Sequence, residues 1–281
     1  MPDTVRLPIG ALTCTVLCDG TSQLAETDLT SMFPGDGGAL VDAFRALPEP
    51  RPISRNILLV ETAGQRVLID AGQGQLDPDD PGRLLDALGK LGITAGAIDT
   101  VIISHYHLDH IGGLLDGDGN PTFRNARLVV PKREHEVKMR EEFLAQLDPF
   151  RAGLLRRTFE AYADRLDVAD GTEEIAPGVR YADLPGHTPG HTGVLLESQG
   201  ARLLHVVDAI HLPIQLNHVD AVLVFDAEPD RAVATRRGAL ERVEADETLL
   251  LAYHFPFPGV GRIARTGEDL RWDACSLPSE D

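Results

Sequence analysis

A segment of closely spaced histidines holds the residues of this chain that most clearly support chemistry. Residues 104–110 read Ser-His-Tyr-His-Leu-Asp-His, and the potential ligands among them are His105, His107, Asp109 and His110. Neutral imidazoles and a carboxylate are the ligands that zinc and similar divalent cations prefer. Because an H-x-H-x-D-H pattern rarely arises by chance in a chain with ten histidines, it predicts a metal site rather than an ordinary polar loop.

The neighbouring residues place this segment at the end of a strand. Residues 99–104 form a β-branched apolar run typical of a buried strand, and Gly112 and Gly113 permit a tight turn after the ligands. Folds of the α/β class place their chemistry at the carboxyl ends of strands. We therefore expect further ligands at the ends of later strands.

Three later residues meet this expectation, each after a predicted strand. His187 follows the strand at 179–183, Asp208 ends the strand at 202–208, and His254 follows the strand at 249–252. A buried core histidine is the alternative for His254, but its position after a strand favours a ligand.

Other polar residues near these motifs have alternative roles. His191 could compete with His187 for a metal, or it could take a hydrogen-bonding role behind the ligands. Asp70, in an Asp-x-Gly turn, is interpreted as support beneath the metal loops. His135 is expected to be an exposed helix residue.

The remaining elements are predicted from periodicity and turn signals. Strands are expected at residues 5–17, 56–62, 66–70, 128–130 and 193–197, and helices at 82–91 and 230–243, the second with Asp230 as its N-cap. Because no repeat or linker interrupts the pattern, we interpret residues 1–281 as one domain. It has insertions at about 20–55 and at 131–161, where one or two helices are expected.

Charge and composition limit the function classes. The chain has 26 basic and 44 acidic residues, and its net charge of −18 disfavours nucleic-acid binding. No apolar run approaches the roughly 18 residues of a membrane span, and the N-terminus has no secretory pattern, so we expect no membrane partner and a cytoplasmic location. The expected partner is a small-molecule substrate, and the 20–55 insertion is compatible with a homodimer.

Together these motifs resemble the metallo-β-lactamase superfamily, from the Leu-Ile-Asp-Ala-Gly turn at 68–72 to His254. The resemblance implies an α/β fold, the four-layer αββα sandwich. It further implies that one metal is held by His105, His107 and His187, that the other is held by Asp109, His110 and His254, and that Asp208 bridges the two. Zinc is the expected metal, although manganese, iron and cobalt tolerate the same ligands.

Within that superfamily, the chain is most similar to the methyl parathion hydrolase-like and acyl-homoserine lactonase branch. Residues 208–211, 224–230, 234–237 and 254–262 carry the similarity to the first of these. The chain departs from some lactonases at His211, where they have a tyrosine that polarises the substrate carbonyl. His211 therefore either takes that role or packs beside the metals. The family motif at the bridging aspartate is Gly-Asp, whereas this chain has Val207-Asp208.

The expected function is hydrolysis of a lactone or ester through a metal-bridging hydroxide. Two cations about 3.5–4 Å apart need a shared anion, which Asp208 can supply, and they lower the pKa of a water toward neutrality. Asp109 would orient the hydroxide or carry its proton to the leaving group. A phosphotriester is the alternative substrate, and a non-catalytic binding protein is the alternative from another class.

The substrate is expected to be uncharged or cationic and moderately apolar. The surface is strongly acidic, and several apolar residues either form the walls of a pocket or belong to the ordinary core. The candidate wall residues are Met32, Phe33, Leu212, Phe255 and Phe257.

Overall fold

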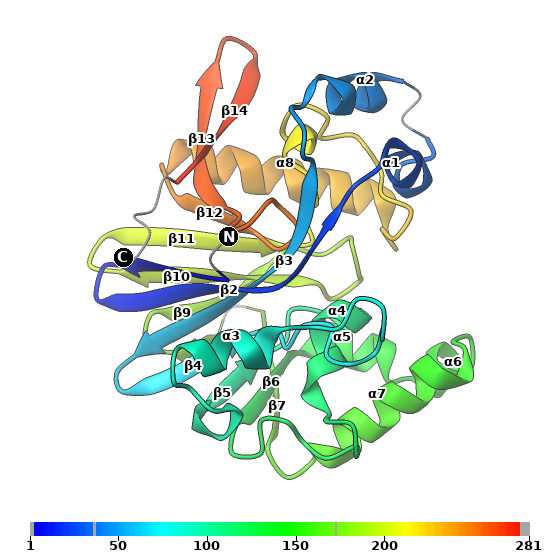
Figure 1. The fold of residues 1–281 in the computed structure, drawn as a ribbon, viewed down its shortest axis with the longest axis vertical. Coiled ribbons are helices and arrows are strands. Elements are labelled where there is room, and N and C mark those ends of the chain that lie inside the picture. The colour runs from blue at the N-terminus through cyan, green and yellow to red at the C-terminus, as the bar shows by residue number, and fades with distance from the viewer. Residues whose placement is uncertain (1–2, 36–37, 172, 276–281) are drawn as a thin grey trace.

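Two β-sheets form the frame of the protein. The computed structural model describes residues 3–35, 38–171 and 173–275. Within this part of the chain, one sheet has the strand order β1 to β7 and the other the order β14 to β8 (Figure 1). The first sheet contains β1 (Thr4–Ile9), β2 (Leu12–Gln23), β3 (Pro52–Thr62), β4 (Gln65–Ile69), β5 (Thr100–Ile102), β6 (Arg127–Pro131) and β7 (Leu166–Ala169). The second contains β8 (Glu174–Ala176), β9 (Val179–Asp183), β10 (Thr192–Ser198), β11 (Ala201–Val207), β12 (Leu249–Ala252), β13 (Val260–Thr266) and β14 (Asp269–Ala274).

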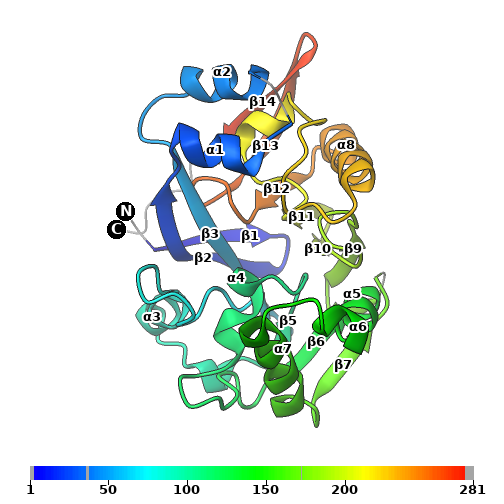
Figure 2. The same ribbon diagram turned by 90° about the vertical axis from the view of Figure 1, so that its right-hand side faces the viewer.

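Helices flank both sheets. Figures 1 and 2 show α3 to α7 grouped on one side of the molecule, α8 on the other, and α1 and α2 together at one end. The helices are α1 (Glu26–Met32), α2 (Ala39–Ala46), α3 (Leu84–Lys90), α4 (Leu108–Ile111), α5 (Lys132–Lys138), α6 (Glu141–Leu144), α7 (Pro149–Ala161) and α8 (Pro229–Ala245). Short 3₁₀ turns are η1 (Ala95–Ala97), η2 (Gly112–Leu114) and η3 (Pro213–Leu216).

Three buried layers of apolar side chains separate these elements. Leu88 of α3 and Phe159 of α7 pack with Val101 of β5, between helices and the first sheet. A second cluster, including residues of β2, β4, β10 and β11, lies between the two sheets. A third joins α8 to β11 and β12. The order helix, sheet, sheet, helix confirms the expected four-layer sandwich.

The turn between β3 and β4 shows how local sequence sets strand pairing. Ala63 and Gly64 have φ values of 48° and 79°, as in the two-residue turns whose twist matches antiparallel strands. The strands then pair from Thr62 with Gln65 to Leu58 with Ile69. The predicted hairpin is therefore confirmed.

One predicted strand is in fact two. Residues 5–17 form the hairpin of β1 and β2, and Gly10 turns the chain with a φ of 58°. A Cβ atom at Gly10 would lie 2.1 Å from the backbone oxygen of Ser198, so only glycine fits there. The prediction failed because the apolar pattern continues on both sides of the turn.

Other boundaries also differ from the predictions. Helix α8 begins at Pro229 with Glu228 as its N-cap, so the assignment of Asp230 was wrong. The 131–161 segment contains α5, α6 and α7 rather than one or two helices. The short strands β7 and β8 and the hairpin of β13 and β14 were not predicted. In the residues described, no helix has the length and apolar character needed to cross a membrane.

Candidate metal centre

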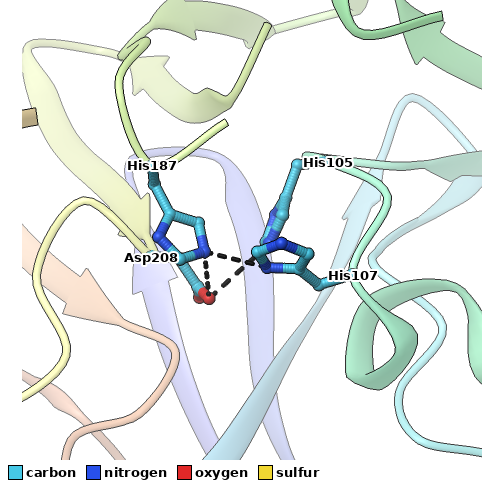
Figure 3. Close-up of side chains that lie close together, drawn as sticks. All are labelled: His105, His107, His187 and Asp208. Atoms are coloured by element: carbon cyan, nitrogen blue, oxygen red, sulfur yellow. Dashed lines mark hydrogen bonds and ion pairs between the residues drawn. The ribbon is translucent and has the colours of Figure 1, made fainter. Parts of the chain in front are cut away.

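The candidate ligands come from loops of both sheets that meet in one place. His105 and His107 follow β5, and His107 precedes the short helix α4, which carries Asp109 and His110. His187 lies between β9 and β10, Asp208 directly follows β11, and His254 follows β12. Figure 3 shows His105 and His107 facing His187 and Asp208 across the boundary between the two halves of the chain.

The first group contains His105, His107, His187 and Asp208, whose ligand atoms all lie within 4.8 Å of one another. Nε2 of His187 lies 2.9 Å from Nδ1 of His107 and 3.3 Å from Oδ2 of Asp208. Nε2 of His105 lies 3.6 Å from the same oxygen (Figure 3). Two ligand atoms on one tetrahedral zinc ion lie about 3.4 Å apart, so this spacing suits a shared cation.

The second group contains Asp109, His110 and His254. Oδ2 of Asp109 lies 3.6 Å from Nε2 of His110 and 3.4 Å from Nε2 of His254. Asp208 also reaches this group, because its Oδ1 lies 3.4 Å from Nε2 of His110 and its Oδ2 3.5 Å from Nε2 of His254. One carboxylate therefore faces both groups.

Buried polar atoms without hydrogen-bond partners test whether these residues suit a metal. Among the residues described, nine buried side-chain polar atoms have no hydrogen-bond partner, and three of them are Nε2 of His105, Nε2 of His110 and Oδ1 of Asp208. An unpaired polar atom in the interior costs about 1–3 kcal/mol. All three belong to the two groups, so a divalent cation would satisfy them, and the donor set fits zinc.

Asp70 and Ser104 hold the histidines from behind. Oδ2 of Asp70 lies 2.8 Å from Nδ1 of His110, and the same carboxylate accepts hydrogen bonds from the backbone N–H and the hydroxyl of Ser104. The Ser104 hydroxyl in turn lies 3.0 Å from Nδ1 of His105. Such contacts fix the orientation of ligand imidazoles. Asp70 therefore supports the metal loops, as predicted.

Asp226 supports His187 in the same way and was not predicted. Its Oδ1 lies 3.0 Å from Nδ1 of His187, and its Oδ2 accepts from the backbone N–H of Leu223. The fully buried Arg236 lies 3.5 Å from the same Oδ2 and donates to three backbone carbonyls. In the sequence Asp226 is only one residue of the 224–230 motif before α8, and that motif does not indicate which side chain it contacts.

Glu134 is a second supporting residue that the sequence did not reveal. It is fully buried, and its carboxylate accepts from the backbone N–H of Tyr106 and of Gly190 and from the hydroxyl of Thr188. It therefore ties the loop of His107 to the loop of His187. The neighbouring His135 is half-buried and lies 2.8 Å from the Tyr106 hydroxyl, so its predicted exposure was wrong.

His191 lies behind Asp208 rather than among the ligand groups. Its Nδ1 is 2.8 Å from the backbone oxygen of Leu184, and its Nε2 accepts from the backbone N–H of Asp208. Burial lowers the pKa of His191 to about 3, so its ring is neutral and can accept that bond. This geometry agrees with the second role predicted for His191, a hydrogen-bonding role behind the ligands.

His211 lies close to the second group. Its Nε2 is 3.3 Å from Oδ2 of Asp208, and its ring stacks on His254 with the planes 13° apart. Burial lowers the pKa of His211 to about 4, so the imidazole is neutral at physiological pH. Asp208, His211 and His254 also form a third set of atoms close enough to share a cation.

The backbone before Asp208 is strained. Val207 has a φ of 51°, in the left-handed region that β-branched residues avoid. The pairing of β11 with β12 shifts register between His205 and Val207. The irregularity turns the chain out of the strand and leads it into Asp208.

Carboxylates and imidazoles in this interior shift each other's pKa values. Burial acts to raise the pKa of Asp208, but His110, His254 and His211 hold it well below its usual range. Burial acts to lower the pKa of His110, but Asp208, Asp109 and Asp70 hold it well above its usual range. For His187, Asp208 and Asp226 outweigh burial and raise the pKa to about 9.

Metal uptake is expected to release the proton of His187, because a ligand imidazole must be neutral. The apparent affinity of the metal-free protein for zinc should therefore rise with pH, with the contribution of His187 complete at about 9 and that of His110, whose pKa is also raised, adding to the slope. Competition with a chromophoric chelator between pH 6.5 and 9.5, corrected for the chelator's own protons, measures this slope. An affinity that does not change between pH 7 and 9 would contradict the assignment of His187.

A cavity of about 430 Å³ opens onto both ligand groups. His107, Asp109, His187, Asp208, His211 and His254 form its polar floor. The rest of the wall is mainly apolar and contains Met32, Ile53, Tyr106, Leu108, Phe143, Leu147, Leu155 and Phe225, together with Lys138 and Arg151. A mainly apolar cavity with a few convergent polar groups is typical of a small-molecule site.

Only Met32 of the predicted wall residues lines this cavity. Phe33 and Leu212 are buried in the cluster that holds α1 and α2, and Phe255 is buried beside α8. Phe257 packs against the cluster between the sheets. The wall residues could not be predicted from the sequence, because α6 and α7 supply several of them and nothing in that segment indicates that it borders the cavity.

Comparison with known proteins agrees with this geometry. Residues 50–253 match the family described as the metallo-β-lactamase superfamily. The chain is 25% identical over 219 residues to an N-acyl homoserine lactonase of Bacillus thuringiensis, covering 70% of this chain and 79% of the relative. It is 26% identical over 236 residues to a probable metallo-hydrolase of Mycobacterium tuberculosis, covering 72% of this chain and 74% of the relative.

Solved structures show the same fold. AidC, described as a dizinc quorum-quenching lactonase in complex with a product, is 27% identical with a TM-score of 0.85, and the match covers 99% of this chain and 100% of AidC. The hydrolase AbOPH of the β-lactamase superfamily is 24% identical with a TM-score of 0.86 and 99% coverage of both chains. The family match spans most of the chain, and the chain therefore belongs to the metallo-β-lactamase superfamily of metal-dependent hydrolases.

Proposed function

We propose that the protein is a dinuclear metal-dependent hydrolase of lactones or esters. The observation that carries the proposal is the Asp208 carboxylate, which lies within 3.6 Å of imidazoles from both ligand groups. Two cations close together need a shared anion, and this carboxylate is placed to provide it. The similarity to lactonases supports a lactone as the first substrate to test.

The proposed ligand sets follow the two groups. His105, His107 and His187 would hold one cation, Asp109, His110 and His254 would hold the other, and Asp208 would be shared between them. When bound, the cations supply a hydroxide nucleophile at neutral pH and positive charge that stabilises the developing oxyanion. Zinc is the proposed metal, because the donors are imidazoles and carboxylates.

Asp109 is the proposed proton carrier. Its Oδ2 faces His110 and His254, so Oδ1 can take the proton of the attacking water and pass it to the leaving alkoxide. Part of the side chain is open to the cavity, which gives the leaving group access to this oxygen. The proton therefore moves from the nucleophile to the alcohol product without an external acid.

His211 is proposed to steady the substrate oxygen. It lines the cavity at the position where some lactonases have a tyrosine, and its neutral ring can donate one hydrogen bond. The stacking on His254 fixes the plane of the ring, and the N–H at Nε2 would be free for the substrate once Asp208 Oδ2, 3.3 Å away, binds a cation instead. A donor held in place before reaction stabilises charge that develops on the substrate.

The first test combines metal analysis with a hydrolysis screen. We expect two metal ions per chain and turnover of lactones or aryl esters that a chelator abolishes and added zinc restores. Methyl parathion belongs in the same screen, since a dinuclear site can also attack phosphorus. Two bound metals without chelator-sensitive turnover of any substrate would contradict the hydrolase and favour a binding protein.

A further inference from the structure

A single buried lysine faces the cavity of the candidate metal centre. Lys138 is the last residue of α5, is only 8% exposed and lies on the cavity wall. Its Nζ lies 4.4 Å from the centre of the Phe143 ring. Phe143, Leu147 and Leu155 make the wall beside it apolar. The positive charge of Lys138 therefore lies in a largely apolar part of the cavity.

The acidic residue one turn earlier does not pair with this charge. Glu134 is four residues before Lys138 on the same helix, a spacing at which a salt bridge is common. Its two oxygens instead accept the three hydrogen bonds from Tyr106, Thr188 and Gly190. Throughout residues 3–35, 38–171 and 173–275, no carboxylate oxygen lies within 4.0 Å of Lys138 Nζ, in contrast to Lys90 and Lys132.

Retaining an ammonium without a carboxylate partner in this position is costly. The Phe143 ring supplies a cation–π contact but no negative charge. Burial lowers the pKa of Lys138, although Glu134 opposes the shift. The same charge acts on His107, whose pKa it helps to lower, so Lys138 lies within electrostatic reach of the metal ligands. An anion in the cavity would remove the cost.

Arg151 adds positive charge to the same wall. It lies near the start of α7, is exposed, and is 3.4 Å from Asp148, its partner on that helix. Solvent therefore screens the charge of Arg151, whereas Lys138 is buried. Lys138 is thus the buried cation on this wall that an anion in the cavity would stabilise.

We infer that Lys138 is a specificity-determining residue that binds an anionic group on the substrate. The inference rests on the proposed hydrolase and narrows its substrate class to lactones or esters whose apolar chain carries a carboxylate. It reverses the expectation of an uncharged or cationic substrate. That expectation came from the net charge of the whole chain, which does not describe this cavity.

Matched substrates test the inference. We would compare 4-nitrophenyl esters of straight-chain diacids of six to ten carbons, whose far end is either a carboxylate or the neutral amide. The metal-loaded protein should prefer the carboxylate by about 10–100-fold in kcat/KM, as expected for a charge-assisted hydrogen bond, and the preference should lie mainly in KM. Lys138→Met should remove the preference, so that the ratio of kcat/KM for the carboxylate to kcat/KM for the amide falls to about one.

Two further variants serve as controls. Lys138→Arg should retain most of the preference, because it keeps the charge, and Arg151→Met should change it little, because Arg151 is exposed and already paired. A wild-type protein without preference would overturn the inference. A preference that persists in Lys138→Met would also overturn it, because the carboxylate would then bind elsewhere, for example on the metals. An equal loss with both substrates would assign Lys138 a structural role.

A binding experiment separates this inference from the proposed function. The chain has three lysines, Lys90, Lys132 and Lys138, so reductive methylation with ¹³C gives a simple lysine spectrum. Octanoate, but not octanamide, should shift the Lys138 signal of the zinc-loaded protein, whether or not any ester is hydrolysed. If octanoate shifts the Lys138 signal but the protein shows no chelator-sensitive turnover, only the proposed hydrolase function is rejected. Turnover without that shift would reject only the anion site.

Discussion

Replacing Asp208 by asparagine should remove at least one of the two metals and reduce hydrolysis by more than about a hundredfold. Loss of a group that merely supports a ligand costs about 10–100-fold, and Asp208 faces both ligand groups directly. The amide keeps the size of the side chain but removes its negative charge. The buried imidazoles of His105, His110, His187 and His254 then lose their shared counter-charge.

Metal content per chain and chelator-sensitive turnover of the best lactone or ester measure this effect. Asp183→Asn is a suitable control, since Asp183 is an exposed aspartate at the end of β9 in the same sheet. Thermal unfolding of both metal-free variants shows whether the fold survives. Two tightly bound metals and full activity in Asp208→Asn would disprove the bridging assignment.

Replacing Arg236 by methionine should lower the free energy of unfolding by about 3–5 kcal/mol, the usual cost of removing one partner of a buried ion pair. Arg236 is fully buried in α8 and donates to the carbonyls of Ala209, Val219 and Ala221. Methionine fills much of the space but leaves these carbonyls and Asp226 without their donor. The carboxylate that supports His187 would then be a buried, poorly compensated charge.

Denaturant unfolding of the chelator-treated protein isolates this effect from metal binding. The adjacent Arg237 provides a matched control, because its side chain is 52% exposed and pairs only with the exposed Asp220. Arg237→Met should change the free energy of unfolding by less than about 1 kcal/mol. Equal stabilities of the two variants would show that the buried network contributes little.

The metal residues were predictable because their signals are local. His105, His107, Asp109 and His110 lie in one continuous motif, and His187, Asp208 and His254 each follow a strand that the sequence predicts. The motif follows β5 of the first sheet and the other three residues follow β9, β11 and β12 of the second, so the site forms where the two sheets pack together. Their roles as ligands stay predictions until metal binding is measured.

The supporting and wall residues were not predictable, because their roles depend on distant contacts. Glu134 is separated by 54 residues from Thr188, whose hydroxyl it accepts, and nothing in its own segment indicates that partner. Lys138 was overlooked for the same reason, since an isolated lysine near a helix end normally faces solvent. The hairpin at Gly10 was missed because apolar alternation continues through a two-residue turn.

The strained backbone at Val207 lies between the buried core and Asp208, the next residue in the chain. A β-branched residue in the left-handed region stores on the order of 1–3 kcal/mol, which only its surroundings can sustain. The Val207 side chain is fully buried in the same cluster as Leu17 and Leu59. We therefore expect that substitutions at such remote core positions would alter the direction in which Asp208 leaves its strand, and libraries that aim at new activities on this fold should include them.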